Sequence, residues 1–338
     1  MSSRPRGRLA RPSALRARVL ALPWRRWLVA NLAQGVDPAA LAPVLRDHGV
    51  PEDEIDRRLR QAAAEAAFAR DLLHRAERAE EVLRLRAALR PRAIERRTTP
   101  DADEFFARYW ATNTPVVLTD LVRRWPAFTR WSPADLRARF GDVEIEAEIG
   151  RAGDPDPDIN YVRHRRALPL AEYIDRVLAA GESDDLYLIA RNHNLARPGL
   201  RPLLDDLDLP PGYFDRDHLA GGAALWFGPA GTVTRLHHDC SNILFCQVVG
   251  RKRLRLAPPD DLALLAATRG LYSTLDPESP PVDGAPIFHD LVLDPGDALF
   301  IPVGWWHHVR ALDLSMSVAL NAFARPQDFA WYLPGKHA

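Results

Sequence analysis

Two stretches of the chain carry residue types that can bind a metal ion. The first contains His237-x-Asp239, within a run whose apolar and β-branched residues predict a strand. Side chains two positions apart on a strand point to the same face, so His237 and Asp239 can bind one ion while His238 points away. The second run ends in His307 and His308. Two histidines and one carboxylate on one face of iron(II) leave three coordination positions open for substrate and oxygen.

An isolated His-x-Asp is common in proteins, so this assignment depends on its surroundings. Lys252 belongs to Arg251-Lys-Arg-Leu-Arg-Leu256, where strand alternation places the three arginines on one face and the lysine with two leucines on the other. Lys252 and Lys336 are the only lysines among the 45 basic residues, so a lysine at this position does not reflect general composition. A buried ammonium group is costly without a counter-charge. The pattern therefore predicts a dicarboxylate ligand beside the metal site.

A larger set of motifs carries a family resemblance, and it extends over about residues 95 to 325. Its members are His237-x-Asp239, Lys252, Pro295-Gly-Asp297, Ile301-Pro302, Trp305-Trp-His307 and Ser317-Val-Ala-Leu-Asn321. They resemble the JmjC/cupin-like family of iron(II)- and 2-oxoglutarate-dependent oxygenases, and the pattern is most similar to the asparaginyl hydroxylase type (factor inhibiting HIF). The resemblance implies a mainly β fold, namely a double-stranded β-helix (jelly roll, or cupin) with flanking helices.

The same resemblance implies roles for individual residues. The second histidine ligand of the family directly follows the tryptophans, which selects His307 over His308 and gives His237, Asp239 and His307 as the metal-binding and catalytic triad.

Five further residues are implied to bind 2-oxoglutarate. Tyr187 and Thr234 resemble the residues that assist Lys252 at the distal carboxylate, and Asn321 resembles an asparagine near the metal-binding carboxylate. The family often has asparagine four residues after the triad aspartate. This chain has Ile243 there, and Asn242 is the candidate in its place.

The implied activity is that of a dioxygenase with Fe(II), 2-oxoglutarate and O2, which hydroxylates a side chain of a protein or peptide substrate. Demethylation of an N-methyl group is chemically adjacent. The alternative is a non-oxygenase metal-binding cupin, either an isomerase or a binding module, and a zinc hydrolase is a third hypothesis. Lys252 argues against the non-oxygenase cupin, because such proteins need no buried partner for a dicarboxylate. The hydrolase is the weaker hypothesis, because zinc sites of that kind usually lack a lysine-bearing strand at this position.

Composition excludes several classes of protein. The apolar content of 47% is a globular value, and the formal net charge of +0 gives no basic field for nucleic acid. No run of 18 apolar residues occurs, so no membrane-spanning helix is expected. The two cysteines, Cys240 and Cys246, are expected on one strand, too far apart for a disulfide. They suit a cytoplasmic location.

Residue patterns predict three segments. Residues 1 to 22 contain arginines but no acidic residue, and we expect a flexible basic tail. Residues 23 to 92 predict a helical N-terminal domain, with Asp37-Pro38 starting one helix and Pro51 opening a long stretch of more than one helix. Such a module can form a partner surface for a homodimer, or a cap on the catalytic domain, which is favoured.

Residues 93 to 338 are the predicted JmjC/cupin-like catalytic domain. Its entry alternates helices with strands at 115 to 119 and 143 to 149. Residues 150 to 166 are rich in turn-forming and charged residues, and we expect a solvated loop rather than a substrate entrance. A long loop at residues 268 to 290 leads to the closing strands and is expected to form a lid or a substrate contact.

Overall fold

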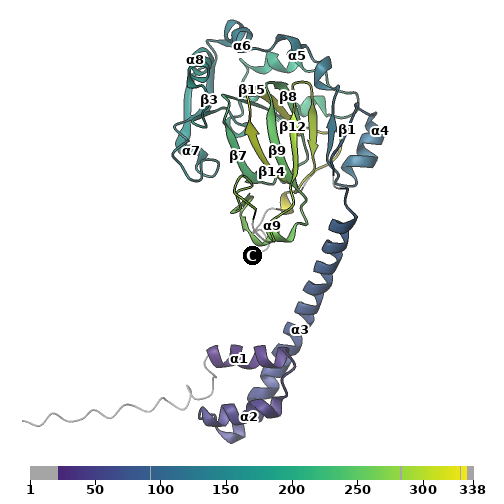
Figure 1. Ribbon diagram of the computed structural model, residues 1–338, viewed down its shortest axis with the longest axis vertical. Coiled ribbons are helices and arrows are strands. Elements are labelled where there is room, and N and C mark those ends of the chain that lie inside the picture. The colour runs from purple at the N-terminus through teal and green to yellow at the C-terminus, as the bar shows by residue number, and fades with distance from the viewer. Residues whose placement is uncertain (1–21, 92, 282–283, 328, 333–338) are drawn as a thin grey trace, which may run out of the picture. The chain divides into compact units, whose positions relative to one another are not determined.

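The computed structural model describes residues 22–91, 93–281, 284–327 and 329–332. The chain divides into two compact units, residues 1–89 and residues 90–338, and each is described by itself (Figure 1). The predicted tail at residues 1 to 22 lies outside the described residues except for Leu22. In the described part of the chain, no helix combines the length and apolarity needed to cross a membrane.

The first unit is a small bundle of three helices: α1 (Leu22–Ala33), α2 (Pro38–Asp47) and α3 (Glu52–Leu89). The Asp37 carboxylate accepts a hydrogen bond from the Ala39 N–H and so caps α2 as predicted. The prediction of more than one helix after Pro51 is wrong, because α3 is a single helix of 38 residues. Its sequence contains no glycine or proline, and nothing ends it before Arg90-Pro91.

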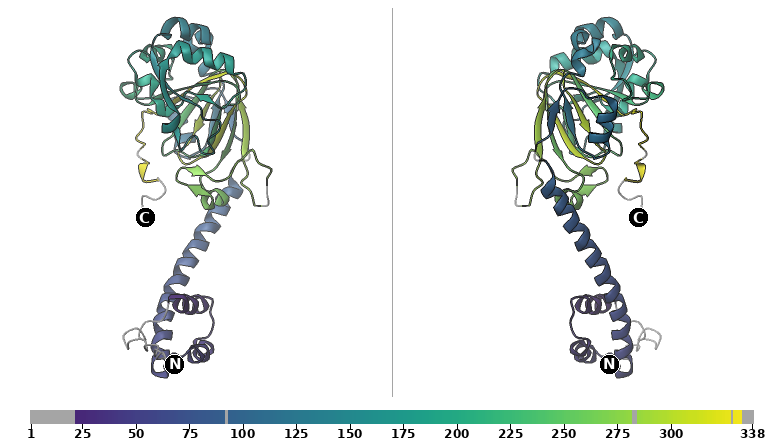
Figure 2. Two further views of the ribbon diagram at one scale, coloured as in Figure 1. Left: turned by 90° about the vertical axis from the view of Figure 1, so that its left-hand side faces the viewer. Right: turned by 90° about the vertical axis from the view of Figure 1, so that its right-hand side faces the viewer.

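The second unit is built on two six-stranded sheets, the double-stranded β-helix that the sequence predicted (Figure 2). The sheet whose strands hold more residues, called the larger sheet below, has the order β1-β2-β13-β8-β15-β6. The other, called the smaller sheet, has the order β10-β11-β7-β14-β9-β12. The strands of the larger sheet are β1 (Glu95–Arg97), β2 (Val116–Leu118), β6 (Ala223–Gly228), β8 (Ile243–Val249), β13 (Ala298–Ile301) and β15 (Ser315–Leu320). Those of the smaller sheet are β7 (Val233–His237), β9 (Lys252–Ala257), β10 (Thr268–Arg269), β11 (Tyr272–Ser273), β12 (His289–Leu293) and β14 (Trp306–Ala311).

Alternating side chains of the two sheets form two cores. Phe245 and Leu299 of the larger sheet meet Leu254 and Val309 of the smaller sheet in an inner core. The alternate residues of the larger sheet, such as Cys246, pack outward against the helices. The inner core gives the site a rigid, apolar wall.

The remaining elements surround this barrel. A third sheet has the order β4-β3-β5, with β3 (Glu144–Ile149), β4 (Arg165–Pro169) and β5 (Leu186–Tyr187). The helices are α4 (Ala102–Phe105), which continues as a π-helical turn at Phe106–Trp110, α5 (Pro126–Arg130), α6 (Pro133–Phe140), α7 (Tyr161–His164), α8 (Leu170–Ala180) and α9 (Leu262–Ala266). Short 3₁₀ turns occur at Val122–Arg124, Ala190–Asn192, Asn194–Ala196, Arg201–Asp206, Arg216–His218 and Ala330–Tyr332. Helices α5, α6 and α8 gather at one end of the barrel and α9 at the other (Figure 1).

The structure differs from the sequence analysis in three connecting segments. Cys240 and Cys246 do not share a strand, because β7 ends at His237 and β8 begins at Ile243; the two do not form a disulfide. Residues 150 to 166 do not form only a solvated loop: they contain α7 and the start of β4, and the side chain of Arg151 is fully buried. Residues 268 to 290 contain the short strands β10 and β11 rather than a structureless loop.

Candidate active site

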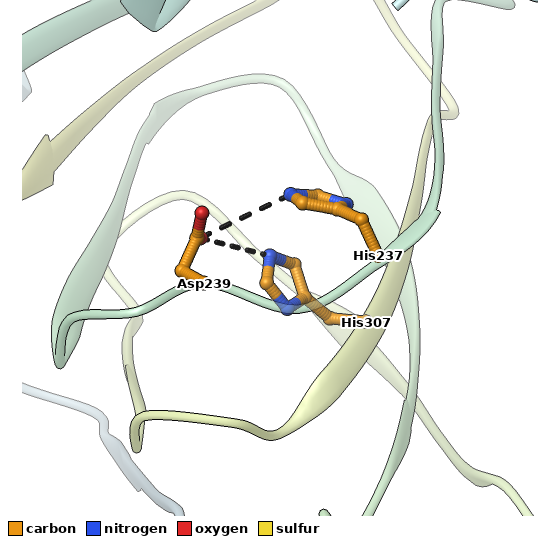
Figure 3. Close-up of side chains that lie close together, drawn as sticks. All are labelled: His237, Asp239 and His307. Atoms are coloured by element: carbon orange, nitrogen blue, oxygen red, sulfur yellow. Dashed lines mark ion pairs between the residues drawn. The ribbon is translucent and has the colours of Figure 1, made fainter. Parts of the chain in front are cut away.

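The predicted triad comes together at the end of β7. His237 is the last residue of β7, Asp239 follows in the turn, and His307 is the second residue of β14, directly paired with His237. The Nε2 atoms of His237 and His307 lie 3.9 and 3.6 Å from Asp239 Oδ2. One candidate ligand atom from each of the three residues lies within 4.8 Å of the other two (Figure 3). The three donors therefore face one point.

The backbone sets the orientation of both imidazole rings. His237 Nδ1 lies 2.7 Å from the carbonyl oxygen of Arg235, and His307 Nδ1 lies 2.9 Å from that of Trp305. Because a carbonyl oxygen only accepts, each Nδ1 carries the proton, and each Nε2 keeps its lone pair for a metal. Burial lowers the pKa of His307 to about 3, which also favours the neutral ring.

The neighbouring histidines, His238 and His308, point away from the triad. His238 packs its ring 4.6 Å from the Trp306 ring on the outer side of the smaller sheet. His308 is buried on that side too, where it lines a cavity of about 440 Å³ together with Arg235 and Arg310. Strand alternation thus separates His307 from His308 as predicted.

Lys252 is fully buried on the inner face of β9, whereas Arg251 and Arg253 are exposed. Its Nζ donates a hydrogen bond to the Tyr187 hydroxyl at 3.1 Å. Lys252 forms no ion pair with a carboxylate in the part of the chain that the structure describes. Burial lowers its pKa to about 7. The site thus holds a cationic group whose charged form lacks a counter-charge.

Thr234 joins this group through an irregularity in β7. Thr234 pairs with Val309 and His237 pairs with His307, so two residues of β7, Arg235 and Leu236, oppose His308 alone. This is a β-bulge, which inserts one extra residue into a strand. It turns Thr234 inward, where its side chain is hydrogen-bonded to Tyr187. Lys252, Tyr187 and Thr234 therefore form one polar cluster.

Two adjoining cavities lead to the triad. The larger one has a volume of about 240 Å³ and the smaller one about 40 Å³. Both are lined by Thr234, His237 and Asp239, and the smaller one ends against Tyr187. The barrel thus offers a passage that connects the triad with the Lys252 cluster.

The two candidate asparagines differ in position. Asn321 lines the larger cavity beside His237 and Asp239. Asn242 does not line either cavity: its Oδ1 accepts a hydrogen bond from the Val303 N–H at 2.9 Å, and its own N–H donates to the Gln327 side chain at 3.1 Å. Asn242 therefore ties two loops together instead of facing the site. Ile243, the residue at the family position, lines both cavities.

Sequence reasoning missed three polar residues that line the larger cavity: Asp158, Arg191 and Tyr272. The Arg191 guanidinium donates to the Tyr272 hydroxyl at 3.2 Å, and the Tyr272 ring lies 5.7 Å from the His237 ring. Tyr272 also pairs with His237 in the sheet. The density of charged residues in 150 to 166 was the only signal for Asp158, and the length of the loop after residue 268 was the only signal for Tyr272. Neither applied to Arg191.

Comparisons with known proteins agree with this geometry. A family model for a cupin-like domain matches residues 102–328. Lysine-specific demethylase JMJ30 of Arabidopsis thaliana is 32% identical over 244 residues, which are 67% of this chain and 54% of that protein. Lysine-specific demethylase 8 of Xenopus tropicalis is 32% identical over 245 residues, 67% of this chain and 52% of the relative.

A third relative is the bifunctional peptidase and (3S)-lysyl hydroxylase JMJD7 of Homo sapiens, 24% identical over 255 residues, which are 65% of this chain and 81% of that protein. The chain spans about half the length of the two demethylases. The cupin-like match, by contrast, extends over most of the second unit and contains the whole triad. The chain therefore belongs to the JmjC/cupin-like family.

Proposed function

We propose that the chain is an Fe(II)- and 2-oxoglutarate-dependent dioxygenase that hydroxylates a side chain of a protein or peptide. The observation that carries the proposal is the joint presence of a two-histidine, one-carboxylate triad and a fully buried lysine without a carboxylate partner among the described residues. The triad suits iron(II) with open coordination positions. The lysine suits a dicarboxylate.

The residues fit both groups. His237, Asp239 and His307 would hold the metal, because both Nε2 atoms are free while both Nδ1 atoms face carbonyl oxygens. Lys252, Tyr187 and Thr234 would bind the distal carboxylate of 2-oxoglutarate, and Asn321 lies where it can contact the other end. Iron(II), when bound, would supply the redox chemistry that couples oxidative decarboxylation of 2-oxoglutarate by O2, which yields succinate and CO2, with oxidation of a substrate C–H bond by the second oxygen atom.

The protein's own part is to orient and enclose the substrate. The larger cavity opens beside the triad, and its lining includes Arg191 and Tyr272, which can hydrogen-bond to an entering side chain. The passage between the cavities is lined by apolar residues such as Trp226 and Ile243, which exclude water from the reacting groups. A side-chain-sized substrate fits such a cavity.

The names of the relatives support the substrate class, since two are lysine-specific demethylases and one is a lysyl hydroxylase. Hydroxylation and N-demethylation share the initial oxidation at carbon, so the same site serves either outcome. The cytoplasmic location, the homodimer and the lack of a nucleic-acid or membrane partner stay predictions from the sequence.

Succinate release separates an oxygenase from a metal-binding cupin that performs isomerisation or binding alone. The protein is purified without oxygen, loaded with Fe(II), and given 2-oxoglutarate and O2. We expect slow succinate formation without a prime substrate, and in a peptide screen a product that gains one oxygen atom by mass spectrometry. Iron binding with no succinate under any condition would favour the non-oxygenase cupin.

A further inference from the structure

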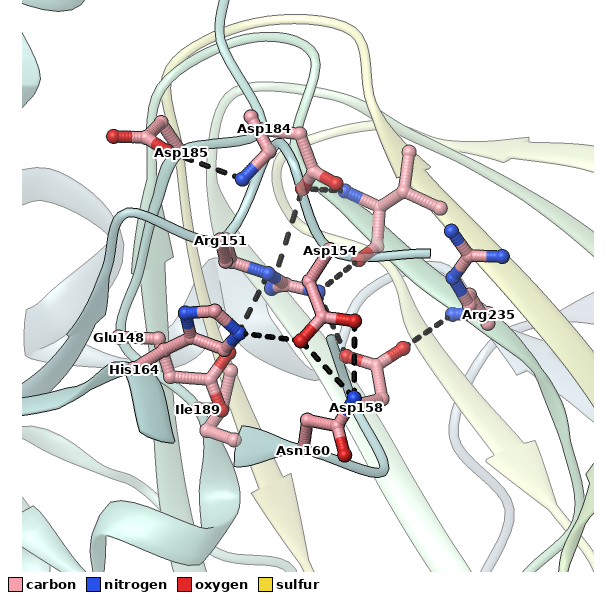
Figure 4. Close-up of polar contacts among 12 residues, drawn as sticks. Glu148, Arg151, Asp154, Asp158, Asn160, His164, Asp184, Asp185, Ile189 and Arg235 are labelled. Carbon is pink, nitrogen blue, oxygen red and sulfur yellow. Dashed lines mark hydrogen bonds and ion pairs between the residues drawn. The ribbon is translucent and has the colours of Figure 1, made fainter. Parts of the chain in front are cut away.

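Three charged side chains lie along one edge of β7: Arg151, Asp158 and Asp184 (Figure 4). On its other edge, β7 is paired with β14. On this edge, the described part of β11 pairs with β7 only at His237. The backbone groups of the preceding residues on this edge therefore need partners from outside the sheet.

The charged side chains provide those partners. The Val233 N–H donates to Asp184 Oδ1 at 2.8 Å, and the Val233 carbonyl accepts from Arg151 Nη2 at 3.1 Å. The Arg235 N–H donates to Asp158 Oδ2 at 2.9 Å. Together they replace a neighbouring strand at residues 233 to 235. Arg235 is the first residue of the bulge, the position that a strand ladder leaves unpaired.

Buried ion pairs fix the positions of Arg151 and Asp158 beside β7. Arg151 is fully buried and Asp158 is 6% exposed. Arg151 Nη2 donates to Asp158 Oδ1 at 2.7 Å, and Arg151 Nε lies 3.4 Å from Glu148 Oε2. The two carboxylate oxygens of Asp158 thus have different partners, since Oδ1 binds the guanidinium and Oδ2 binds the bulge. A buried charged pair of this kind has little freedom to move, because breaking it leaves an uncompensated charge.

The Arg235 backbone connects this pair to a triad residue. Its N–H is bound by Asp158, and its carbonyl oxygen lies 2.7 Å from His237 Nδ1. The position of that carbonyl decides which nitrogen of His237 carries the proton and where Nε2 points. We propose that Asp158, fixed by Arg151, is a positioning residue that holds the β7 bulge and thereby keeps the His237 imidazole in its ligand orientation. The inference rests on the proposed function for the identity of the metal, and goes beyond it in the role of Asp158.

The main test is Asp158→Asn. A carboxamide has one oxygen, so it can accept from Arg151 or from the Arg235 N–H but leaves the other bond unmade. In the metal-free full-length protein, ¹⁵N NMR of labelled histidine reports the tautomer of His237. We expect the Nδ1–H form in the parent protein and a mixture of tautomers in the variant. Titration with Co(II) should show affinity reduced by about 10- to 100-fold, the usual cost of disturbing the hydrogen-bond partner of a metal-binding histidine, which here is the Arg235 carbonyl.

A milder second variant is Arg151→Lys, which keeps a positive charge among the carboxylates but has one nitrogen in place of the three that face Glu148, Asp158 and Asp184. We expect a smaller shift in the same direction. A folded form of either variant with the parental tautomer and parental Co(II) affinity overturns the proposal.

Asp206→Asn is the matched control. Asp206 is 3% exposed and also accepts hydrogen bonds from two side chains, Arg139 and Trp131, but it lines neither of the cavities at the triad. We expect a loss of thermal stability with unchanged Co(II) affinity. An equal loss of affinity in Asp206→Asn would mean that general destabilisation explains the effect, and would overturn the positioning role. A parent protein that binds no Co(II) contradicts the proposed function, while the tautomer comparison still decides the role of Asp158.

Discussion

Thr234 and His237 point into the same cavity although they lie three positions apart along β7. In a regular strand, residues three positions apart face opposite sides of the sheet. The extra residue of the bulge at Arg235 and Leu236 restores the common face. A candidate metal ligand and a candidate cosubstrate-binding hydroxyl thus share one wall of the barrel.

Removal of the carboxylate ligand is the most direct check of the metal site. Asp239→Ala should abolish tight Fe(II) binding and succinate formation, because two histidines cannot complete a facial triad. Iron content after anaerobic loading and desalting measures this. Asp175→Ala, which removes an exposed carboxylate paired with Arg137, serves as the control and should load like the parent. Equal iron in Asp239→Ala and the parent would contradict the assignment.

The two adjacent histidines of β14 should behave differently. His307→Ala should eliminate metal binding, whereas His308→Ala should leave metal occupancy largely intact, because His308 lies on the opposite face of the sheet. Metal content and thermal stability are measured for both variants, since His308 is buried and its loss should lower stability. An empty site in His308→Ala and a loaded one in His307→Ala would reverse the predicted register.

The choice of His307 over His308 as the ligand came from the family resemblance, but strand alternation was enough to predict that the two histidines face opposite sides and that Lys252 faces inward. It separates His307 from His308 and places Lys252 inside while Arg251 and Arg253 stay outside. These predictions succeed because the period of two is a property of the local backbone. Identifying the family then supplied the pairing of segments that lie far apart in the sequence.

The bulge and the buried arginine were not predictable in this way. A period-two pattern carries no mark of an inserted residue, so the common face of Thr234 and His237 follows only from the pairing with β14. Arg151 is buried because Glu148, Asp158 and Asp184 arrive from three separate segments, and a lone arginine in a polar stretch is normally exposed. Both features are decided by tertiary contacts.

Lys252 can be tested separately from the metal. Lys252→Met keeps an apolar stem of similar length but removes the charge, so iron should still bind. The half-saturating concentration of 2-oxoglutarate should rise by about one to two powers of ten, from the roughly 1.5–3 kcal/mol of a charge-assisted hydrogen bond. Lys252→Arg should restore it only in part, because the planar guanidinium is wider. The measurement is the rate of succinate formation against 2-oxoglutarate concentration, with the iron content of each protein checked. An unchanged half-saturating concentration in Lys252→Met would remove the main argument for a dicarboxylate.

Binding of 2-oxoglutarate should take up a proton above neutral pH. Burial lowers the pKa of Lys252 to about 7, so the free protein loses the ammonium proton at alkaline pH, whereas a bound carboxylate favours the charged form. Calorimetric titrations near pH 8 in buffers of different ionisation enthalpy measure the uptake, with Mn(II) in place of iron. Lys252→Met should show none from this group, and equal uptake in both proteins would assign the proton elsewhere.

Glu148 predicts a pH dependence of folding stability. Burial raises its pKa to about 7, and the nearby Arg151 only partly opposes this. The folded state therefore holds a proton that the unfolded state releases near pH 4.5, and the contribution of Glu148 to stability falls as the pH rises from about 4.5 to 7.

Glu148→Gln cannot ionise. The free energy of unfolding of the variant minus that of the parent should therefore increase with pH across this range and stay constant above it. Denaturant unfolding at several pH values measures the difference. Glu172→Gln, at an exposed ion pair on α8, should run parallel to the parent. Parallel curves for Glu148→Gln as well would contradict the prediction.

The burial of Lys252 beside Tyr187 has a further consequence, because it links the cosubstrate to the persistence of the fold itself. A ligand that binds only the folded chain shifts the unfolding equilibrium by mass action, by about 2.7 kcal/mol at a hundredfold excess over Kd. In this protein the same ligand also relieves the electrostatic penalty of a confined ammonium group. The folded population would then rise and fall with the supply of 2-oxoglutarate, so that a shortage would expose the chain to unfolding and proteolysis as well as slow its turnover.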